Sequence, residues 1–323
     1  MADPSSRWIS AHLFCWTDLD TVLTDAVAPL LGELHDQGTV RRAFYLRYWE
    51  GGPHLRLRLQ PAAPEHELAL RARLLGLRPA LDAGRPDAPR VREYAAAAAR
   101  LAAAEHRADD YDRDLRTRGQ VEFVPYRPEH DWYGHGPALA AIEKHFCRCS
   151  HLMLGAVAAA TPAAARAGLA FALHVAAACT AVPEPDNLDG YASAADSDYR
   201  ARPALRRQAE RCWQLTHAPT GPAPGGGVLA TWTASLRALH ATLINPALYR
   251  PSLPEYARQH PAATGPLPIV YTRLAHLAAN RLGISPGQEH RIAALARAAL
   301  ADLTTRPPAT PPPHQEHADE GGA

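Results

Sequence analysis

A strand–turn–strand segment between Phe44 and Leu59 constrains the fold of this chain more than any other part of the sequence. From Phe44 to Trp49 the side chains alternate with the two-residue period of a half-buried strand. The next four residues, Glu-Gly-Gly-Pro, have the composition of a tight turn, because glycine accepts positive φ and proline restricts the exit. We therefore predict an antiparallel hairpin over residues 44–59.

The second strand of this hairpin separates apolar from basic side chains. Three leucines point to one face, and three basic residues share the opposite face: His54, Arg56 and Arg58. Neighbours on one face of a strand lie roughly 6.5 to 7 Å apart, so the sequence predicts a cationic row that suits a carboxylate or another anion. The alternative is a solvated strand face, in which the arginines form structural ion pairs with Glu129 or another acid.

Composition excludes several classes of function. The chain has 323 residues, 47% of them hydrophobic, and a formal net charge of +1, which gives no reason to expect a nucleic-acid partner. Its five cysteines are scattered and odd in number, which favours reduced thiols and a cytoplasmic protein. No signal peptide opens the chain and no apolar run spans a membrane, so we expect no membrane partner.

Strand patterns crowd the first 130 residues and helical patterns dominate the rest, which predicts an α+β fold. In this fold a mixed or antiparallel sheet from the N-terminal half packs against a predominantly helical C-terminal half. The expected strands are 8–16, 44–49, 54–59 and 121–126. The expected helices are 19–34, 65–77, 91–112, 137–160, 162–181, 202–215, 228–243, 270–282 and 287–303. We expect one domain over 8–304, disordered ends at 1–7 and 305–323, a loop at 182–191 and a flexible linker at 218–227.

Two regions outside the hairpin are rich in residues that could do chemistry. The irregular segment 126–137 carries Glu129, two histidines and several aromatic residues, which is typical of the wall of a site. The spacing of its acids and histidines fits no standard zinc pattern, and the chain has no phosphate-binding or hydrolase motif. We therefore expect no metal and no cofactor.

The second region is the helix 270–282. His276 and Asn280 are four residues apart and share one face of it. His276 has two interpretations, either a satisfied core or interface histidine or a general acid or base. Spacing alone does not choose between them.

Three segments also carry a family resemblance. The first is Arg47-Tyr48 followed by Gly-Pro-His-Leu-Arg-Leu-Arg, the second is Tyr-x-Pro-Glu-x-x-Trp-Tyr-Gly at 126–134, and the third is His-x-x-x-Asn-Arg-Leu at 276–282. In the same order they resemble motifs in the C-terminal domain of class I lantibiotic dehydratases. That domain also occurs as a stand-alone protein in thiopeptide-type bacteriocin biosynthesis. The resemblance runs from about Trp8 to Leu303.

In the dehydratases this domain removes glutamate from glutamylated Ser or Thr of a precursor peptide. Such a β-elimination needs a base for the α-proton and cations for the departing carboxylate. The resemblance implies that Arg58 and His276 are catalytic. At the position of a further family arginine this chain has Trp132, whose indole cannot pair with a carboxylate as a guanidinium does.

Thiopeptide pyridine synthases resemble the same domain and perform a formal [4+2] aza-cycloaddition between two dehydroalanines, followed by loss of water and of the leader peptide. Trp132 favours this second activity. So do Tyr-Trp-x-Gly-Gly-Pro-His at 48–54 and Asn-Arg-Leu-Gly-Ile at 280–284, which resemble the synthase forms of the motifs. We therefore predict a pyridine-forming enzyme whose partner is a precursor peptide, consisting of a leader and a dehydrated core.

In this hypothesis His276 and Tyr133 polarise or protonate the amide that must tautomerise, and Arg58 with Arg56 holds carbonyls or the oxygen lost as water. The alternative for Tyr133 is simple ring packing. The residues predicted to bind substrate are His54, Arg56, Arg47, Trp132, Glu129 and Asn280. Two other functions stay open: a glutamate eliminase that works with a separate glutamylating dehydratase subunit, and a non-catalytic subunit that binds the leader along its sheet edge.

Overall fold

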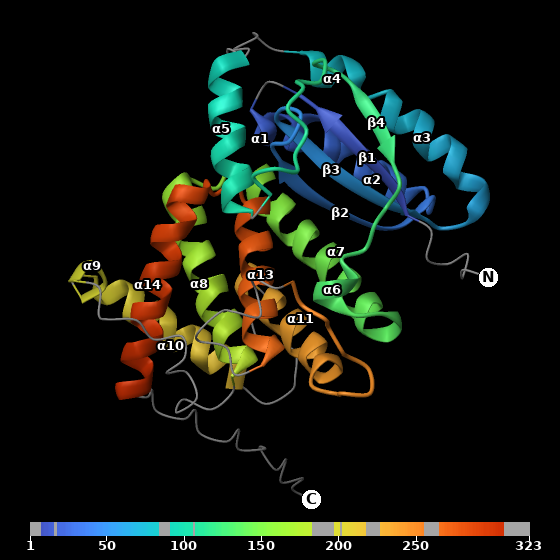
Figure 1. The fold of residues 1–323 in the computed structure, drawn as a ribbon. Helices are drawn as coiled ribbons and strands as arrows, with labels where there is room; N and C mark the ends of the chain where they lie inside the picture. Colours follow the sequence, from blue (N-terminus) through green and yellow to red (C-terminus); the bar gives the residue numbers. More distant parts are fainter. Residues whose placement is uncertain are drawn as a thin grey trace, which may run out of the picture.

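A computed structural model describes residues 8–15, 18–83, 91–105, 107–182, 197–200, 202–217, 227–254 and 265–306. A four-stranded antiparallel sheet forms the N-terminal part, and the later part of the chain is helical (Figure 1). The predicted α+β class is confirmed. The predictions for 1–7, for most of the loop 182–191 and for nearly all of the linker 218–227 lie outside the described residues, as does the tail from 307 on.

The sheet has the strand order β2-β3-β1-β4, and each strand runs antiparallel to its neighbours. The strands are β1 (Ile9–Phe14), β2 (Val40–Tyr48), β3 (His54–Pro61) and β4 (Val121–Val124). The hairpin predicted for residues 44–59 is therefore β2 and β3. In the register of β1 with β3, Ser10 lies opposite Arg58 and His12 opposite Arg56, so the polar face of β3 continues onto β1.

The other face of the sheet is apolar and is covered by the helices that follow β1 and β3. They are α1 (Leu19–Val22), a π-helical turn (Leu23–Val27), α2 (Ala28–Asp36), a 3-10 turn (Pro64–His66), α3 (Glu67–Leu75) and α4 (Arg78–Asp82). The first three elements form the helix predicted for 19–34, and Asp18 caps it as expected, accepting a hydrogen bond from the backbone of Asp20. The π turn directly precedes Pro29, which has no N–H to donate to the preceding turn.

The helical part is built around α8 (Ala163–Ala181). Its neighbours are α10 (Pro203–His217), α11 (Val228–Leu243), α13 (Pro266–Arg281) and α14 (Pro286–Thr305). Contrary to the sequence expectation, α8 is long and apolar enough to cross a membrane by length and composition. Four helices pack against it, however, and residues 170–182 are buried, so a core helix accounts for the same composition.

The sheet and the helical part meet at the outer edge of β2. Ser150, on α7 (Gly136–Ala158), accepts a hydrogen bond from the Tyr45 N–H at 3.1 Å, and Arg281 donates to the Tyr45 carbonyl at 2.9 Å. Two residues along β2, the side-chain amide of Asn280 makes both hydrogen bonds to the backbone of Arg47, each 3.0 Å long. Side chains therefore take the place of a further strand on this edge.

Several predicted boundaries differ from the structure, and two of them matter for the site. The helix predicted for 91–112 is α5 (Val91–Ala104), and the chain after it turns back to contact the hairpin. Glu105 accepts hydrogen bonds from Tyr48 and Trp49, and Arg107 pairs with Glu50, so tertiary contacts override the helical composition. The segment 126–137, predicted to be irregular, contains the short helix α6 (His130–Tyr133) and the first residues of α7. A further short helix, α9 (Ser197–Arg200), follows α8 in the chain.

Candidate active site

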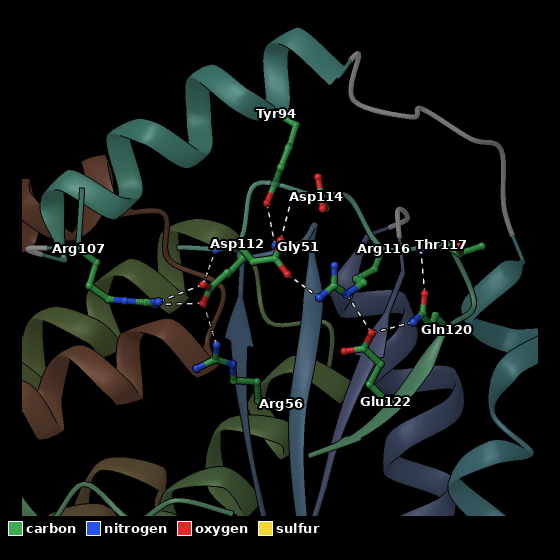
Figure 2. A network of polar contacts seen from close by, with 11 residues as sticks. Gly51, Arg56, Tyr94, Arg107, Asp112, Asp114, Arg116, Thr117, Gln120 and Glu122 are labelled. Atoms are coloured by element: carbon green, nitrogen blue, oxygen red, sulfur yellow. Dashed lines mark hydrogen bonds and ion pairs between the residues drawn. The ribbon is translucent and has the colours of Figure 1, made fainter. Parts of the chain in front are cut away.

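The turn of the hairpin has the predicted geometry. Gly51 and Gly52 have φ values of 76° and 111°, which side chains other than glycine rarely adopt. A Cβ atom on Gly51 would also lie 3.3 Å from both Arg116 and Phe14. The Gly51 N–H donates to the Tyr94 hydroxyl at 2.7 Å, so α5 holds the tip of the hairpin in place (Figure 2).

Glu50, at the start of the turn, collects the hydrogen bonds of several neighbours. Arg107 donates to both carboxylate oxygens at 3.0 Å, and the Asp112 N–H donates at 2.9 Å (Figure 2). Burial alone would raise the pKa of Glu50, but these donors hold that pKa below its usual value. The turn therefore carries a fixed negative charge.

Arg56 is the first cation of β3 and has structural partners. Its guanidinium lies 3.5 Å from Glu50 and stacks on the Tyr48 ring, with 3.2 Å between the guanidinium carbon and the ring centroid. The alternative of a structural ion pair is therefore realised for Arg56, with Glu50 as the acid. Its Nε atom is nevertheless buried and has no hydrogen-bond partner among the described residues.

Arg58, the next residue on this face, has no ion-pair partner in the described part of the chain. Its Nη1 atom is buried without a hydrogen bond to any described group. Burial and the positive charge of Arg56 lower the pKa of Arg58 to about 9, while Tyr126 and Glu129 oppose that shift. Arg58 is therefore still protonated near pH 7, and it is a half-buried cation whose Nη1 has free hydrogen-bonding capacity.

His54 does not contribute to the predicted cationic row. It is fully buried, its ring stacks near those of His12 and Phe14, and burial lowers its pKa to about 3. Burial likewise lowers the pKa of His12 to about 2, with the positive charges of Arg56 and Arg58 adding to the effect. Both rings are therefore neutral near pH 7, and the row has two cations rather than three.

The neutral His54 ring has a defined tautomer. Its Nδ1 lies 2.8 Å from the Gly52 carbonyl, which can only accept, so Nδ1 carries the proton. Nε2 is then a buried acceptor, and it has no partner among the described residues. Across the strands the Ser10 hydroxyl is also buried and unpartnered within the described ranges. We refer to Ser10, His54, Arg56 and Arg58 as the polar sheet face.

The segment 126–133 joins the polar sheet face to α13. Tyr126 donates a hydrogen bond to Glu143 at 2.8 Å, and Trp8 donates to the same carboxylate at 3.2 Å. Phe44, which lies opposite Arg58, contacts the rings of Trp8 and Tyr126. Aromatic packing therefore holds this segment against β2 beside Arg58.

Arg273 on α13 contacts three of the predicted site residues. It pairs with Glu129 at 2.5 Å, donates from Nε to the Tyr133 hydroxyl at 3.1 Å, and its guanidinium carbon lies 4.5 Å from the centre of the Trp132 ring. Trp132 and Tyr133 are buried, so the Tyr133 ring packs as the alternative expects, but its hydroxyl accepts a hydrogen bond from Arg273. A guanidinium thus lies beside Trp132, although it comes from another segment of the chain.

His276 follows Arg273 by one helical turn and is exposed. Its Nδ1 contacts Glu289 of α14. Asn280 and Arg47 lie away from the polar sheet face. Arg47 is opposite Leu55, on the apolar side of β3, where it donates to Asp20 at 2.6 Å.

The glycine of the third motif has a structural explanation as well. Gly283 has a φ of 79°, and a Cβ atom there would lie 3.0 Å from the Arg47 guanidinium. The structure therefore brings Arg58, Glu129, Trp132 and Tyr133 to the region between β3 and α13, whereas His54 lies at the hairpin end of β3. It gives Arg47 and Asn280 partners within the fold, and their role in substrate binding stays a prediction.

Sequence reasoning missed the roles of Arg273 and Glu289. Arg273 lies outside every motif. The only signal for it in the sequence is its spacing of three residues before His276, which puts both side chains on one face of the helix. No sequence signal identified Glu289. Within the described ranges, no group of three or more His, Cys, Asp and Glu side chains could hold a metal ion.

The sequence matches the family described as "Lantibiotic biosynthesis dehydratase C-term" over residues 8–300. This chain belongs to that family. The lantibiotic dehydratase family acts on precursor peptides of ribosomally made natural products, by glutamate elimination or by pyridine formation. No curated protein sequence is similar enough to this chain to count as a relative.

Solved structures with a similar fold include three that cover nearly all of this chain. The pyridine synthase TbtD from thiomuracin biosynthesis superposes with a TM-score of 0.69 at 18% identity, over 93% of this chain and 99% of its own. The tRNA-dependent lantibiotic dehydratase MibB from Microbispora sp. 107891 gives 0.59 at 21% identity, over 95% of this chain and 29% of its own. TsrL gives 0.54 at 20% identity, over 94% and 99%. At identities of 18 to 21%, this structural similarity shows that the chain has the same fold as these proteins, and it does not assign their activities to it.

Proposed function

We propose that this lantibiotic dehydratase family member is a pyridine synthase. It would carry out a formal [4+2] aza-cycloaddition between two dehydroalanines of a precursor peptide, and then release water and the leader peptide. Arg58, Tyr133 and His276 would act on the reacting amide, and positioning of the two peptide segments would supply much of the rate. The polar sheet face supports this proposal most strongly.

The unpartnered atoms of that face suit an amide better than a carboxylate. Arg58 Nη1 and Arg56 Nε can only donate, whereas His54 Nε2 can only accept. A carboxylate can only accept hydrogen bonds, so it could pair with the arginines but would be repelled by the lone pair on His54 Nε2. A peptide backbone offers carbonyl oxygens and N–H groups in turn along its length, so it can satisfy groups of both kinds.

The segment at Trp132 also supports this proposal. Where the eliminases have an arginine, this chain has an indole. The guanidinium nearest to it belongs to Arg273 and is already neutralised by Glu129 at 2.5 Å. A departing glutamate would therefore compete with an internal carboxylate for that cation.

Glutamate elimination is the second candidate, and one observation favours it. Arg273 brings a guanidinium to within 4.5 Å of the Trp132 ring, near the point where the eliminases have theirs in sequence. Rearrangement of Glu129 would free that cation for a substrate carboxylate. The partner would then be a separate glutamylating subunit.

The non-catalytic alternative needs an open sheet edge. At Tyr45 and Arg47 the edge of β2 already bonds Ser150, Arg281 and Asn280. A leader peptide that extends the sheet would therefore have to pair with β4 at the opposite edge.

Two synthetic peptides separate these functions. The purified protein is incubated with a leader-bearing peptide that contains two dehydroalanines, and separately with a glutamylated Ser peptide. We expect the first to give pyridine and free leader by mass spectrometry, with the second unchanged. Loss of glutamate from the second without pyridine from the first would overturn the proposal in favour of elimination, and binding without either product would favour the scaffold.

A further inference from the structure

An exposed histidine is held by a carboxylate that is itself buried. Both oxygens of Glu289 lie within hydrogen-bond distance of His276 Nδ1, at 2.8 and 2.9 Å. The side chain of His276 is 51% exposed, whereas that of Glu289 is only 12% exposed. The contact therefore fixes one side of the ring and leaves the other side, with Nε2, toward solvent.

The surroundings of Glu289 keep it ionised and in place. It lies in the first turn of α14, where the helix dipole favours negative charge, and a capping box between Ser285 and Gln288 fixes that turn. From α8, His174 Nε2 approaches the same carboxylate to 3.6 Å. Burial alone would raise the pKa of Glu289, but the contacts with His174 and His276 lower it to about 2.

The protonation of His276 follows from this contact. An ionised carboxylate only accepts hydrogen bonds, so the Nδ1 that faces it must carry the proton. In the neutral ring Nε2 then has the free lone pair, which is the form that a general base needs. Among the described residues, Glu289 of α14 is the charged group in contact with His276. His174 of α8 approaches the same carboxylate, and Arg273 precedes His276 by three residues on α13.

We propose that Glu289 is a positioning residue that holds His276 in the Nδ1–H tautomer, so that Nε2 takes the proton of the substrate amide. This inference rests on the proposed function. The amide N–H bond breaks, its proton bonds to Nε2, and the electron pair left behind forms the C=N bond of the tautomer. The carbonyl oxygen takes the proton that the Tyr133 hydroxyl donates.

Both protons are accounted for at the end of the reaction. His276 returns its proton to the oxygen that leaves as water. Aromatisation releases two ring C–H protons, of which one restores Tyr133 and the other bonds to the amide nitrogen of the departing leader. No oxidant or reductant is needed. Glu289 itself exchanges no proton with the substrate and acts only through the histidine.

The test compares three variants of the whole protein. Glu289→Gln removes the charge but keeps the shape, Glu289→Asp keeps the charge, and Asp302→Asn is the matched control. Asp302 lies on the same helix and is also 12% exposed, but it pairs with Arg206 and Tyr199 instead. Its loss reports the structural cost of removing a buried carboxylate from α14.

Two readouts distinguish positioning from structure. The ¹⁵N NMR signals of the His276 ring, identified by their loss in His276→Gln, give the tautomer. Pyridine formation from the bis-dehydroalanine peptide gives kcat and KM. In Glu289→Gln we expect a mixture of tautomers and a kcat about 100-fold lower with little change in KM. Glu289→Asp should restore the Nδ1–H tautomer and most of kcat, and Asp302→Asn should leave kcat unchanged.

Two results would overturn the proposal. One is a Glu289→Gln protein whose ring stays in the Nδ1–H tautomer, and the other is a changed tautomer with unchanged kcat. A wild-type protein that forms no pyridine would instead contradict the proposed function, and with it the catalytic use of this contact. In that case the NMR spectra of the wild type and of Glu289→Gln would still decide whether Glu289 sets the tautomer of His276.

Discussion

The two faces of β3 are formed by alternate residues of one strand, but their side chains differ in how far neighbouring groups meet their packing and hydrogen-bonding needs. Leu55, Leu57 and Leu59 are fully buried among other apolar side chains. On the other face, polar atoms of His54 and Arg58 are buried without partners among the described residues. An unmade hydrogen bond in the interior costs roughly 1–3 kcal/mol, so the fold alone gives no reason to keep such groups. Under the proposed function, one face serves the fold and the other serves the substrate.

The helix α13 repeats this division along its length. Its last turn is structural, because Asn280 and Arg281 bond to the edge of β2. Two turns earlier Arg273 contacts the Tyr133 hydroxyl, and one turn earlier His276 contacts Glu289. The Tyr133 hydroxyl and the His276 ring are groups that can take part in proton transfer. The family motif at 276–282 therefore contains residues of both kinds.

The largest expected effect lies on the apolar face. Leu57→Ala should lower the free energy of unfolding by about 2–5 kcal/mol, because it leaves a cavity beneath the sheet. Denaturant titration measures this change. Leu68→Ala is the matched control, since Leu68 is 79% exposed and should lose almost nothing. Equal losses in the two variants would contradict the assignment of the apolar face.

Arg281 tests the joint between the sheet and the helices. Its side chain is 1% exposed and bonds to the carbonyls of Tyr45 and Leu277. Arg281→Met should cost about 3 kcal/mol of unfolding free energy, because it leaves those buried carbonyls short of a donor. The exposed Arg250→Met serves as the control. An Arg281 variant that is as stable as the wild type would refute the structural role.

Asn280 separates a structural role from a substrate contact. Asn280→Ala removes two hydrogen bonds to the backbone of Arg47 and should cost about 1–2 kcal/mol, with KM for the precursor peptide unchanged. Stability is measured by denaturant titration and KM by product formation. A raised KM with unchanged stability would support the sequence-based prediction that Asn280 binds substrate.

The smallest effect is a pH dependence at Glu289. Because the pKa of Glu289 in the folded protein is lowered from 4.5 to about 2, its stabilising contribution is present above about pH 4.5. It is lost as the pH falls from there toward 2. The difference in unfolding free energy between wild type and Glu289→Gln should therefore be smaller at pH 3 than at pH 5. A difference that grows between pH 5 and pH 3 would contradict the ion pair.

Local patterns in the sequence predict much of this fold. The alternation at 44–59, the Glu-Gly-Gly-Pro turn and the helical periods of α7, α8 and α13 are short-range signals, and each element forms as predicted. The end of α5 was not predictable in this way, because Glu105 and Arg107 are drawn to the hairpin by contacts distant in sequence.

The candidate site was predictable only in part, for the same reason. Arg58 and His276 lie in motifs, but the partner of each predicted group depends on packing between separate segments. The neutral state of His54 follows from its burial beside His12, which no pattern in β3 reveals. The approach of Arg273 to Trp132 requires knowing how α13 packs on α6.

The most direct test of the central claim is the rate of pyridine formation by Arg58→Met with the bis-dehydroalanine peptide, measured by mass spectrometry on a sample of known stability. If the polar sheet face serves the substrate, the rate should fall by about 100-fold or more. The free energy of unfolding should stay the same or rise, since the variant removes a half-buried cation whose Nη1 has no partner among the described residues. An Arg58→Met protein that retains the full rate would contradict this account of the polar sheet face.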